Sequence, residues 1–268
     1  MMTENTDTER TPVVFRRYEM KYMITRRQFA RLLPVIMKYM KEDEFGRYKI
    51  CNIYLDTKEY SLVRTSLEKP LYKEKLRLRS YGTPQPDSFV FLELKKKYDG
   101  IVYKRRVPMT LEEARMYLSR GIYPAERDGQ NLRELDFAVS KYKPVPGAYL
   151  SYDRISLVGI DNPLLRMTFD HNITCRNTDM LLEHGSYGQK ILDDDKLIME
   201  VKIPDNMPLW LASLLSESRI FPTGYSKYGT YYTVCLAGEA PASQRHSESP
   251  AVDQEIAAVV EKGGVYCA

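Results

Sequence analysis

Residues 73–79 read Lys-Glu-Lys-Leu-Arg-Leu-Arg, and this alternation is the main structural signal of the sequence. Successive side chains of a β-strand point to opposite faces, so four cations of this stretch share one face and its two leucines lie on the other. Ionisable residues also occupy every second position in residues 91–95, 103–106 and 199–202. The pattern predicts several strands of one sheet, with one apolar face and one face that collects Lys, Arg and Glu.

The bulk composition indicates an ordinary soluble globular protein. The 268 residues are 43% hydrophobic and 28% charged, which is enough for a large core in one or two domains. A net charge of +4 is small for a general nucleic-acid binder, so we expect no nucleic-acid partner. Residues 1–12 are polar and unlike a signal peptide, and no apolar run approaches the roughly 20 residues that span a bilayer. We therefore expect a cytoplasmic protein.

The order of the predicted elements gives the fold class. We expect a disordered N-terminus over residues 1–12, one domain over 13–236 and a flexible tail over 237–268 that ends in a short helix over 251–268. Strands are predicted over 13–22, 48–56, 71–81, 88–98, 100–108, 147–157, 164–176 and 196–203, and helices over 26–41, 57–66, 110–121, 131–142 and 208–218. These elements lack βαβ alternation, which predicts an α+β fold built on an eight-stranded antiparallel barrel with flanking helices.

Two arrangements satisfy the charged strands. One is an open sheet with a solvated charged face, and the other is a barrel whose lumen is lined by the charges. A solvated face would mix Lys, Glu, Thr, Ser and Gln, whereas these strands are rich in Arg, whose planar fork matches phosphate oxygens. Six strands place charged residues on one face in this way, which favours a lumen that binds a polyanion, such as a phosphate chain, together with a divalent metal.

Four carboxylates lie within these cation-rich strands: Glu19, Glu93, Asp170 and Glu200. Each could pair with neighbouring Lys and Arg, or could bind Mg²⁺ or Mn²⁺, which take one or two carboxylates plus substrate phosphates. Nearby cations would keep such carboxylates ionised. The Tyr-Ser-Lys-Tyr of residues 225–228 is either an exposed loop or a binder of a terminal phosphate.

The same residues carry a family resemblance. Residues 91–97 followed by 100–106 resemble the VTC domain, the vacuolar transporter chaperone type of polyphosphate polymerase, which belongs to the triphosphate tunnel metalloenzymes. Further agreements in order cover roughly residues 13–236; they are residues 16–22, 75–79, 152–154, 166–170, 199–202 and 225–228.

The resemblance implies an eight-stranded antiparallel tunnel that binds triphosphate through cations and Mn²⁺ or Mg²⁺ through carboxylates. The residues predicted as catalytic are Lys21, Arg77, Arg79, Lys95, Arg154 and Arg166. Those predicted to bind phosphate are Lys104, Ser226 and Lys227 by similarity, and Lys75, Arg106 and Lys202 from the alternation. Glu200 is the metal ligand by similarity, and the carboxylate pattern adds Glu19 and Glu93.

Two positions depart from the wider pattern. The superfamily opens with Glu-x-Glu-x-Lys, but residues 17–21 read Arg-Tyr-Glu-Met-Lys and lack the first Glu. Gly224 stands where some VTC domains carry a further Lys, which removes one phosphate contact. Fewer carboxylates leave less capacity to activate water, which favours phosphate transfer over hydrolysis.

The predicted reaction is transfer of the terminal phosphate of ATP to a growing inorganic polyphosphate chain. The acceptor is already an oxyanion, so no strong general base is needed, and a tunnel open at both ends would let the product thread away. Two alternatives remain: a triphosphate hydrolase of the same fold, and a non-catalytic polyphosphate or nucleotide sensor. The predicted partners are ATP and polyphosphate; export would require a separate membrane partner, and the sequence does not give the oligomeric state.

Overall fold

The computed structural model describes residues 18–124, 129–204 and 206–236, and it confirms the α+β class. Its strands are β1 (Tyr18–Thr25), β2 (Met40–Asp56), β3 (Tyr72–Tyr81), β4 (Phe89–Tyr98), β5 (Ile101–Thr110), β6 (Val145–Gly159), β7 (Arg166–Arg176), β8 (Gln189–Lys190) and β9 (Lys196–Ile203). Its helices are α1 (Arg26–Ile36), α2 (Ser61–Leu67), α3 (Leu111–Arg120), α4 (Gln130–Tyr142), α5 (Leu209–Glu217) and α6 (Lys227–Tyr231), with a 3₁₀-helix over Leu182–His184 and a π-helix over Tyr232–Leu236. The segments predicted over 1–12, 237–268 and 251–268 lie outside the described residues.

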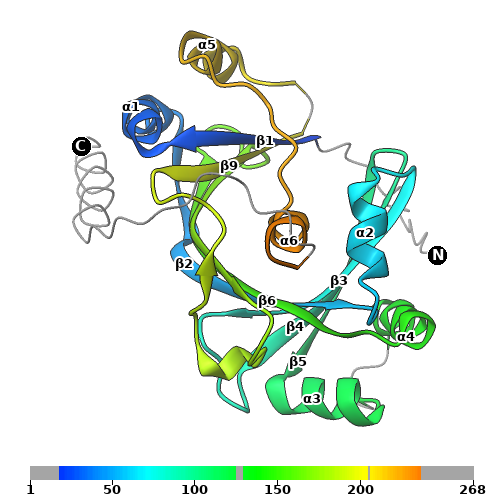
Figure 1. Cartoon of the computed structure of the whole chain (residues 1–268). Helices are drawn as coiled ribbons and strands as arrows, with labels where there is room; N and C mark the ends of the chain where they lie inside the picture. Colours follow the sequence, from blue (N-terminus) through cyan, green and yellow to red (C-terminus); the bar gives the residue numbers. More distant parts are fainter. Residues whose placement is uncertain (1–17, 125–128, 205, 237–268) are drawn as a thin grey trace, which may run out of the picture.

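One antiparallel sheet contains every described strand. Eight strands follow the order β1-β9-β7-β6-β2-β3-β4-β5, and the two-residue β8 pairs with β7. The sheet curves around α6, as Figure 1 shows, but hydrogen bonds do not join its end strands β1 and β5. The predicted barrel is therefore a curved sheet with two edges. An ion pair of 3.7 Å joins Glu19 on the end strand β1 to Lys95 on β4, the neighbour of the other end strand β5.

Helices cover the convex face of this sheet, where the alternate apolar residues gather. α1 and α5 pack on β1, β9 and β7, and Phe29 meets the ring of Phe169 edge-to-face at 4.8 Å. α3 and α4 pack on β4 and β5, where Leu135 and Leu92 belong to one buried cluster. Full burial of each such side chain contributes about 1.5–3 kcal/mol, so this face fixes the position of the strands.

Local signals explain where several helices begin and end. Thr25 and Thr110 each form a capping box, with Gln28 and Glu113 respectively, and Gly121 ends α3 in the left-handed conformation at φ 67°. The helix predicted over 26–41 ends at Ile36 instead, with Pro34 in its last turn. β2 then begins at Met40 rather than residue 48, because Met40, Lys41 and Glu42 already pair with β6. None of the described helices is long and apolar enough to cross a membrane.

Candidate functional site

The strand register places every predicted site residue of the sheet on one face. Directly opposed residues in an antiparallel pair point to the same side. Glu19 lies opposite Lys202, and Lys21 lies opposite Glu200. The same row continues through Arg166 opposite Lys202, Arg154 opposite Asp170, Arg77 opposite Glu93, Glu93 opposite Arg106, Asn52 opposite Arg79, Lys75 opposite Lys95 and Lys95 opposite Lys104. This is the concave face, because helices cover the other one.

Glu93 holds the largest group of these cations. Its carboxylate is 2% exposed and lies 2.6 Å from Arg77 Nη2, 2.7 Å from Lys104 Nζ, 3.3 Å from Arg106 Nε and 3.9 Å from Arg79 Nε. Burial opposes its ionisation, but Arg77, Arg79 and Lys104, in that order, outweigh burial and lower the pKa of Glu93 strongly. Its surroundings therefore suit a residue that orients cations, and its predicted role as a metal ligand stays a prediction.

Asp170 organises a second group. The fully buried carboxylate accepts two hydrogen bonds from Arg154, at 2.6 and 2.7 Å, and one from Lys227 Nζ at 2.5 Å. Although burial alone would raise it, the pKa of Asp170 is lowered to about 2 by Lys227 and Arg154. Lys227 also lies 4.4 Å from the ring centre of Tyr152. Two predicted phosphate binders from distant segments thus meet at one carboxylate.

Glu19 and Glu200 form the carboxylate group best suited to a metal. Lys21 lies 2.8 Å from Glu19 and 3.6 Å from Glu200, and Lys202 lies 2.9 Å from Glu200. Against burial, Lys202 and Lys21 keep the pKa of Glu200 low, so the carboxylate is ionised at neutral pH. The described residues contain no group of three or more His, Cys, Asp or Glu that could hold an ion alone. The donor set fits Mg²⁺ or Mn²⁺ only if substrate phosphates supply the remaining ligands.

The predicted Ser-Lys pair lies on α6, which sits inside the curve of the sheet (Figure 1). Ser226 caps this helix and accepts a hydrogen bond of 3.0 Å from Lys75 Nζ. Tyr228 stacks on Tyr54 of the concave face at 4.6 Å and donates to Asp56 at 3.0 Å. These contacts place α6 against one end of the concave face, and the expected passage open at both ends stays a prediction.

Tyr54 and Lys75 share an unusual electrostatic setting beside α6. Burial opposes ionisation of the Tyr54 phenol, yet Arg77 and the neighbouring cations lower its pKa to about 8. Burial lowers the pKa of Lys75 to about 8; Tyr54 opposes this shift, and repulsion from Lys21 and other lysines adds to it. This end of the face consequently changes charge just above neutral pH.

Two remaining predicted residues differ in exposure. Arg79 is 7% exposed; it donates to Asn52 at 2.9 Å and to the Tyr152 hydroxyl at 3.4 Å, so its guanidinium is held in place. Arg166 is exposed at the end of β7, and no ion pair to it is found among the described residues. It is thus available at the end of the face that lies away from α6.

The predicted set omits several residues that shape this face, namely Asn52, Tyr54, Asp56, Tyr152 and Asp170. Asp170 was visible as a carboxylate in a cation-rich strand, but the others lie in stretches that read as strand core. Asp56 ends β2 and accepts hydrogen bonds from the backbone N–H groups of Thr57, Leu62 and Val63, which places the start of α2.

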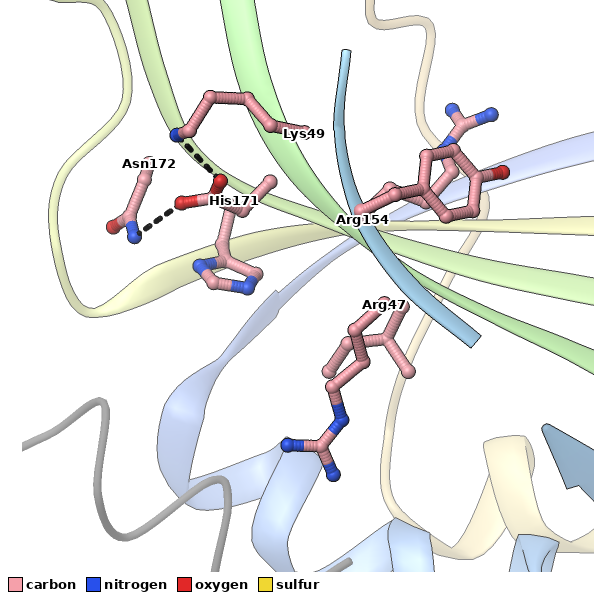
Figure 2. A pocket seen from close by; sticks show the side chains of 8 residues that line it. Arg47, Lys49, Arg154, His171 and Asn172 are labelled. Carbon is pink, nitrogen blue, oxygen red and sulfur yellow. Dashed lines mark hydrogen bonds and ion pairs between the residues drawn. The ribbon is translucent and has the colours of Figure 1, made fainter. Parts of the chain in front are cut away.

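A hollow of about 290 Å³ lies beside Tyr48 and Arg154. Figure 2 shows Arg154, Lys49 and Asn172 around it. Its polar side chains are largely satisfied by one another. Asp153 accepts from Lys49 at 2.5 Å and from Asn172 at 2.9 Å, and Arg47 points away from these three. The hollow therefore offers little surplus positive charge compared with the concave face.

Comparison with known proteins identifies a family for the chain. The VTC domain model matches residues 16–236. No curated protein matches the chain. Similar solved structures include a candidate adenylate cyclase from Bacillus halodurans, which is 17% identical with a TM-score of 0.49 over 78% of this chain and 92% of that one. Another is a candidate adenylyl cyclase from Hippeastrum described as having a dominant triphosphatase activity, which is 14% identical with a TM-score of 0.47 over 85% of this chain and 99% of that one. Because the family match includes all the residues of the concave face described above, the chain belongs to the VTC domain family.

Proposed function

We propose that this protein is a metal-dependent polyphosphate polymerase that transfers the terminal phosphate of ATP to a growing inorganic polyphosphate chain. Membership of the VTC domain family supports this proposal, because the resemblance described above is to polyphosphate polymerases. The concave face supports it further, since cations from seven strands and α6 converge there with only a few carboxylates.

The proposed chemistry is positioning and charge stabilisation. Phosphoryl transfer spreads negative charge over the transferred group, and fixed cations stabilise that charge most when they need not reorganise. Glu93 holds Arg77, Lys104 and Arg106 in place, while Asp170 holds Arg154 and Lys227. Mn²⁺ or Mg²⁺, bound between Glu200, Glu19 and the substrate, would neutralise phosphate charge.

The observation that carries the proposal is that the buried carboxylates are paired with cations. Glu93, Asp170 and Glu200 are all ion-paired, and cations hold the pKa of each below its ordinary range. A carboxylate so stabilised as an anion is a poor base toward water. A phosphate acceptor needs no base, because it is already ionised, so the face suits transfer to phosphate better than hydrolysis.

Hydrolysis of a short triphosphate is the second candidate. It is favoured by α6, whose Tyr228 covers one end of the concave face through Tyr54 and Asp56. A face covered at one end accommodates a short substrate more readily than a chain that must pass through.

Incubation of the purified protein with ATP and Mn²⁺ tests the choice. A polymerase yields long polyphosphate and ADP, resolved by gel electrophoresis and phosphorus NMR. Release of inorganic phosphate without chains would sink the polymerase proposal in favour of hydrolysis. Binding of ATP or polyphosphate without any turnover would identify a sensor instead.

A further inference from the structure

Four aromatic side chains form a continuous row, which we call the aromatic rim: Phe45, Tyr48, Tyr81 and Phe91. Each meets the next edge-to-face, with ring centres 6.2 Å apart for Phe45 and Tyr48, 5.6 Å for Tyr48 and Tyr81, and 5.7 Å for Tyr81 and Phe91. Phe45 is 67% exposed and Tyr81 is 48% exposed, so much of their ring surface faces solvent. Tyr48 and Phe91 are half-buried. Single exposed rings are common, but two exposed rings in one row of aromatic side chains beside a binding face indicate a partner.

The rim lies at the end of the concave face that α6 leaves uncovered. Tyr48 and Tyr54 lie on the same side of β2, six residues apart, which corresponds to about 20 Å along a strand. Tyr54 stacks on Tyr228 of α6, whereas Tyr48 contacts the rim. Tyr81 follows Arg79 on the same face of β3, two positions further from α6.

Arg106 connects the rim to the cation group on Glu93. Its guanidinium lies 3.6 Å from the ring centre of Phe91, and its Nη2 donates to the Tyr81 hydroxyl at 2.9 Å. Its Nε lies 3.3 Å from Glu93. The aromatic surface therefore begins where the phosphate-binding cations end, with one arginine in both.

We propose that the aromatic rim is a stacking platform for the base of a nucleoside triphosphate whose phosphates lie among the cations of the concave face. The inference rests on the proposed function, because it requires a triphosphate on that face. A phosphate chain has no aromatic group, so the rim acts on the donor alone. The base stacks at the uncovered end, and the terminal phosphate points toward Lys75, Ser226 and Lys227 beside α6.

The chemistry of the rim also sets its selectivity. Every base has a π-face, so stacking on aromatic rings tolerates any base. Phe45 and Tyr81 present exposed ring surfaces, whereas Arg106 covers one face of Phe91 and also engages the hydroxyl of Tyr81. We therefore expect the protein to prefer nucleoside triphosphates over inorganic tripolyphosphate, with little discrimination between ATP and GTP.

Calorimetry with two ligands in Mg²⁺ tests the proposal: a β,γ-imido analogue of ATP, and inorganic tripolyphosphate. The double substitution Phe45→Ala/Tyr81→Ala should weaken binding of the nucleotide analogue by roughly 5- to 100-fold, the range expected for lost base stacking, and leave tripolyphosphate within about twofold. Tyr81→Phe keeps the ring and should retain the nucleotide preference. Phe137→Ala is the matched control, since this ring is equally exposed at 67% but lies on α4.

The two proposals fail differently. If the wild-type protein binds neither ligand, both are overturned. If it binds tripolyphosphate and the nucleotide analogue equally well, or if Phe45→Ala/Tyr81→Ala weakens both ligands alike or neither, only the stacking role of the rim is overturned.

Discussion

Replacing Glu93 by Gln tests whether this carboxylate orients the surrounding cations or binds a metal. In the structure this carboxylate is 2% exposed and faces Arg77, Lys104, Arg106 and Arg79. Gln keeps the shape and one oxygen acceptor but removes the negative charge. Four cations are then left close together with no compensating anion, so the unliganded protein should lose stability.

The size of the loss follows from the geometry. Removing one partner of a buried ion pair costs about 3–5 kcal/mol. Arg77 and Lys104 are 24% and 45% exposed, so solvent screens part of the repulsion and we expect the lower value of about 3 kcal/mol. For a domain of this size each kcal/mol lowers Tm by about 2–4 °C, which gives a decrease of roughly 6–12 °C.

Thermal and urea unfolding measure this loss, with and without inorganic tripolyphosphate. The ligand supplies the missing negative charge, so it should raise the Tm of Glu93→Gln more than that of the wild type. Glu134→Gln is the control, because that carboxylate also faces two cations, Lys96 at 3.1 Å and Arg105 at 2.8 Å, but is more exposed and should cost at most about 1 kcal/mol. A Glu93→Gln protein as stable as the wild type, with loss of metal-dependent stabilisation only, would refute the orienting role.

Three further outcomes follow from the same face. Glu200→Gln should abolish metal-dependent turnover while leaving tripolyphosphate affinity within a few-fold; full activity in the ATP and Mn²⁺ assay would exclude Glu200 as a ligand. Arg77→Ala should weaken triphosphate binding by about 10- to 100-fold, at roughly 1.5–3 kcal/mol per charged hydrogen bond lost, and calorimetry showing unchanged affinity would contradict this. Affinity should fall between pH 7 and pH 9, because Lys75 loses its positive charge and Tyr54 becomes an anion as pH rises through about 8. Lys75→Arg combined with Tyr54→Phe should retain affinity at pH 9, and an unaltered pH profile in that variant would argue against these two groups.

The alternation of charges predicted the concave face well, because it depends only on the two-residue period of a strand. Lys75, Arg77 and Arg79 had to share a side whatever the topology, and the register then brought them opposite Lys95, Glu93 and Phe91. Which strands become edges is decided by long-range pairing instead. Nothing in residues 18–25 or 101–110 indicated that these strands would end the sheet unpaired.

The remaining features depend on contacts between distant residues. α6 has only five residues, one of them a glycine, which is too short to show a helical period in the sequence. It forms where Ser226 caps it and Tyr228 stacks on Tyr54. Tyr54 sits between Ile53 and Leu55, so its neighbours read as strand core. Phe45 precedes the predicted start of its strand at residue 48, and the early start of β2 is what brings it to Tyr48.

The contact between Lys95 on β4 and Glu19 on β1 is an ion pair that spans the open side of the sheet, and it differs in kind from the contacts between neighbouring strands. Neighbouring strands in the interior are held by backbone hydrogen bonds, which salt hardly affects, whereas this contact is a pair of half-exposed charges 3.7 Å apart. A phosphate group competes for Lys95 with the carboxylate that holds it. The gap between the two edges of the sheet should thus be narrowest without a ligand and at low ionic strength. Its width then depends on the bound ligand as well as on the fold.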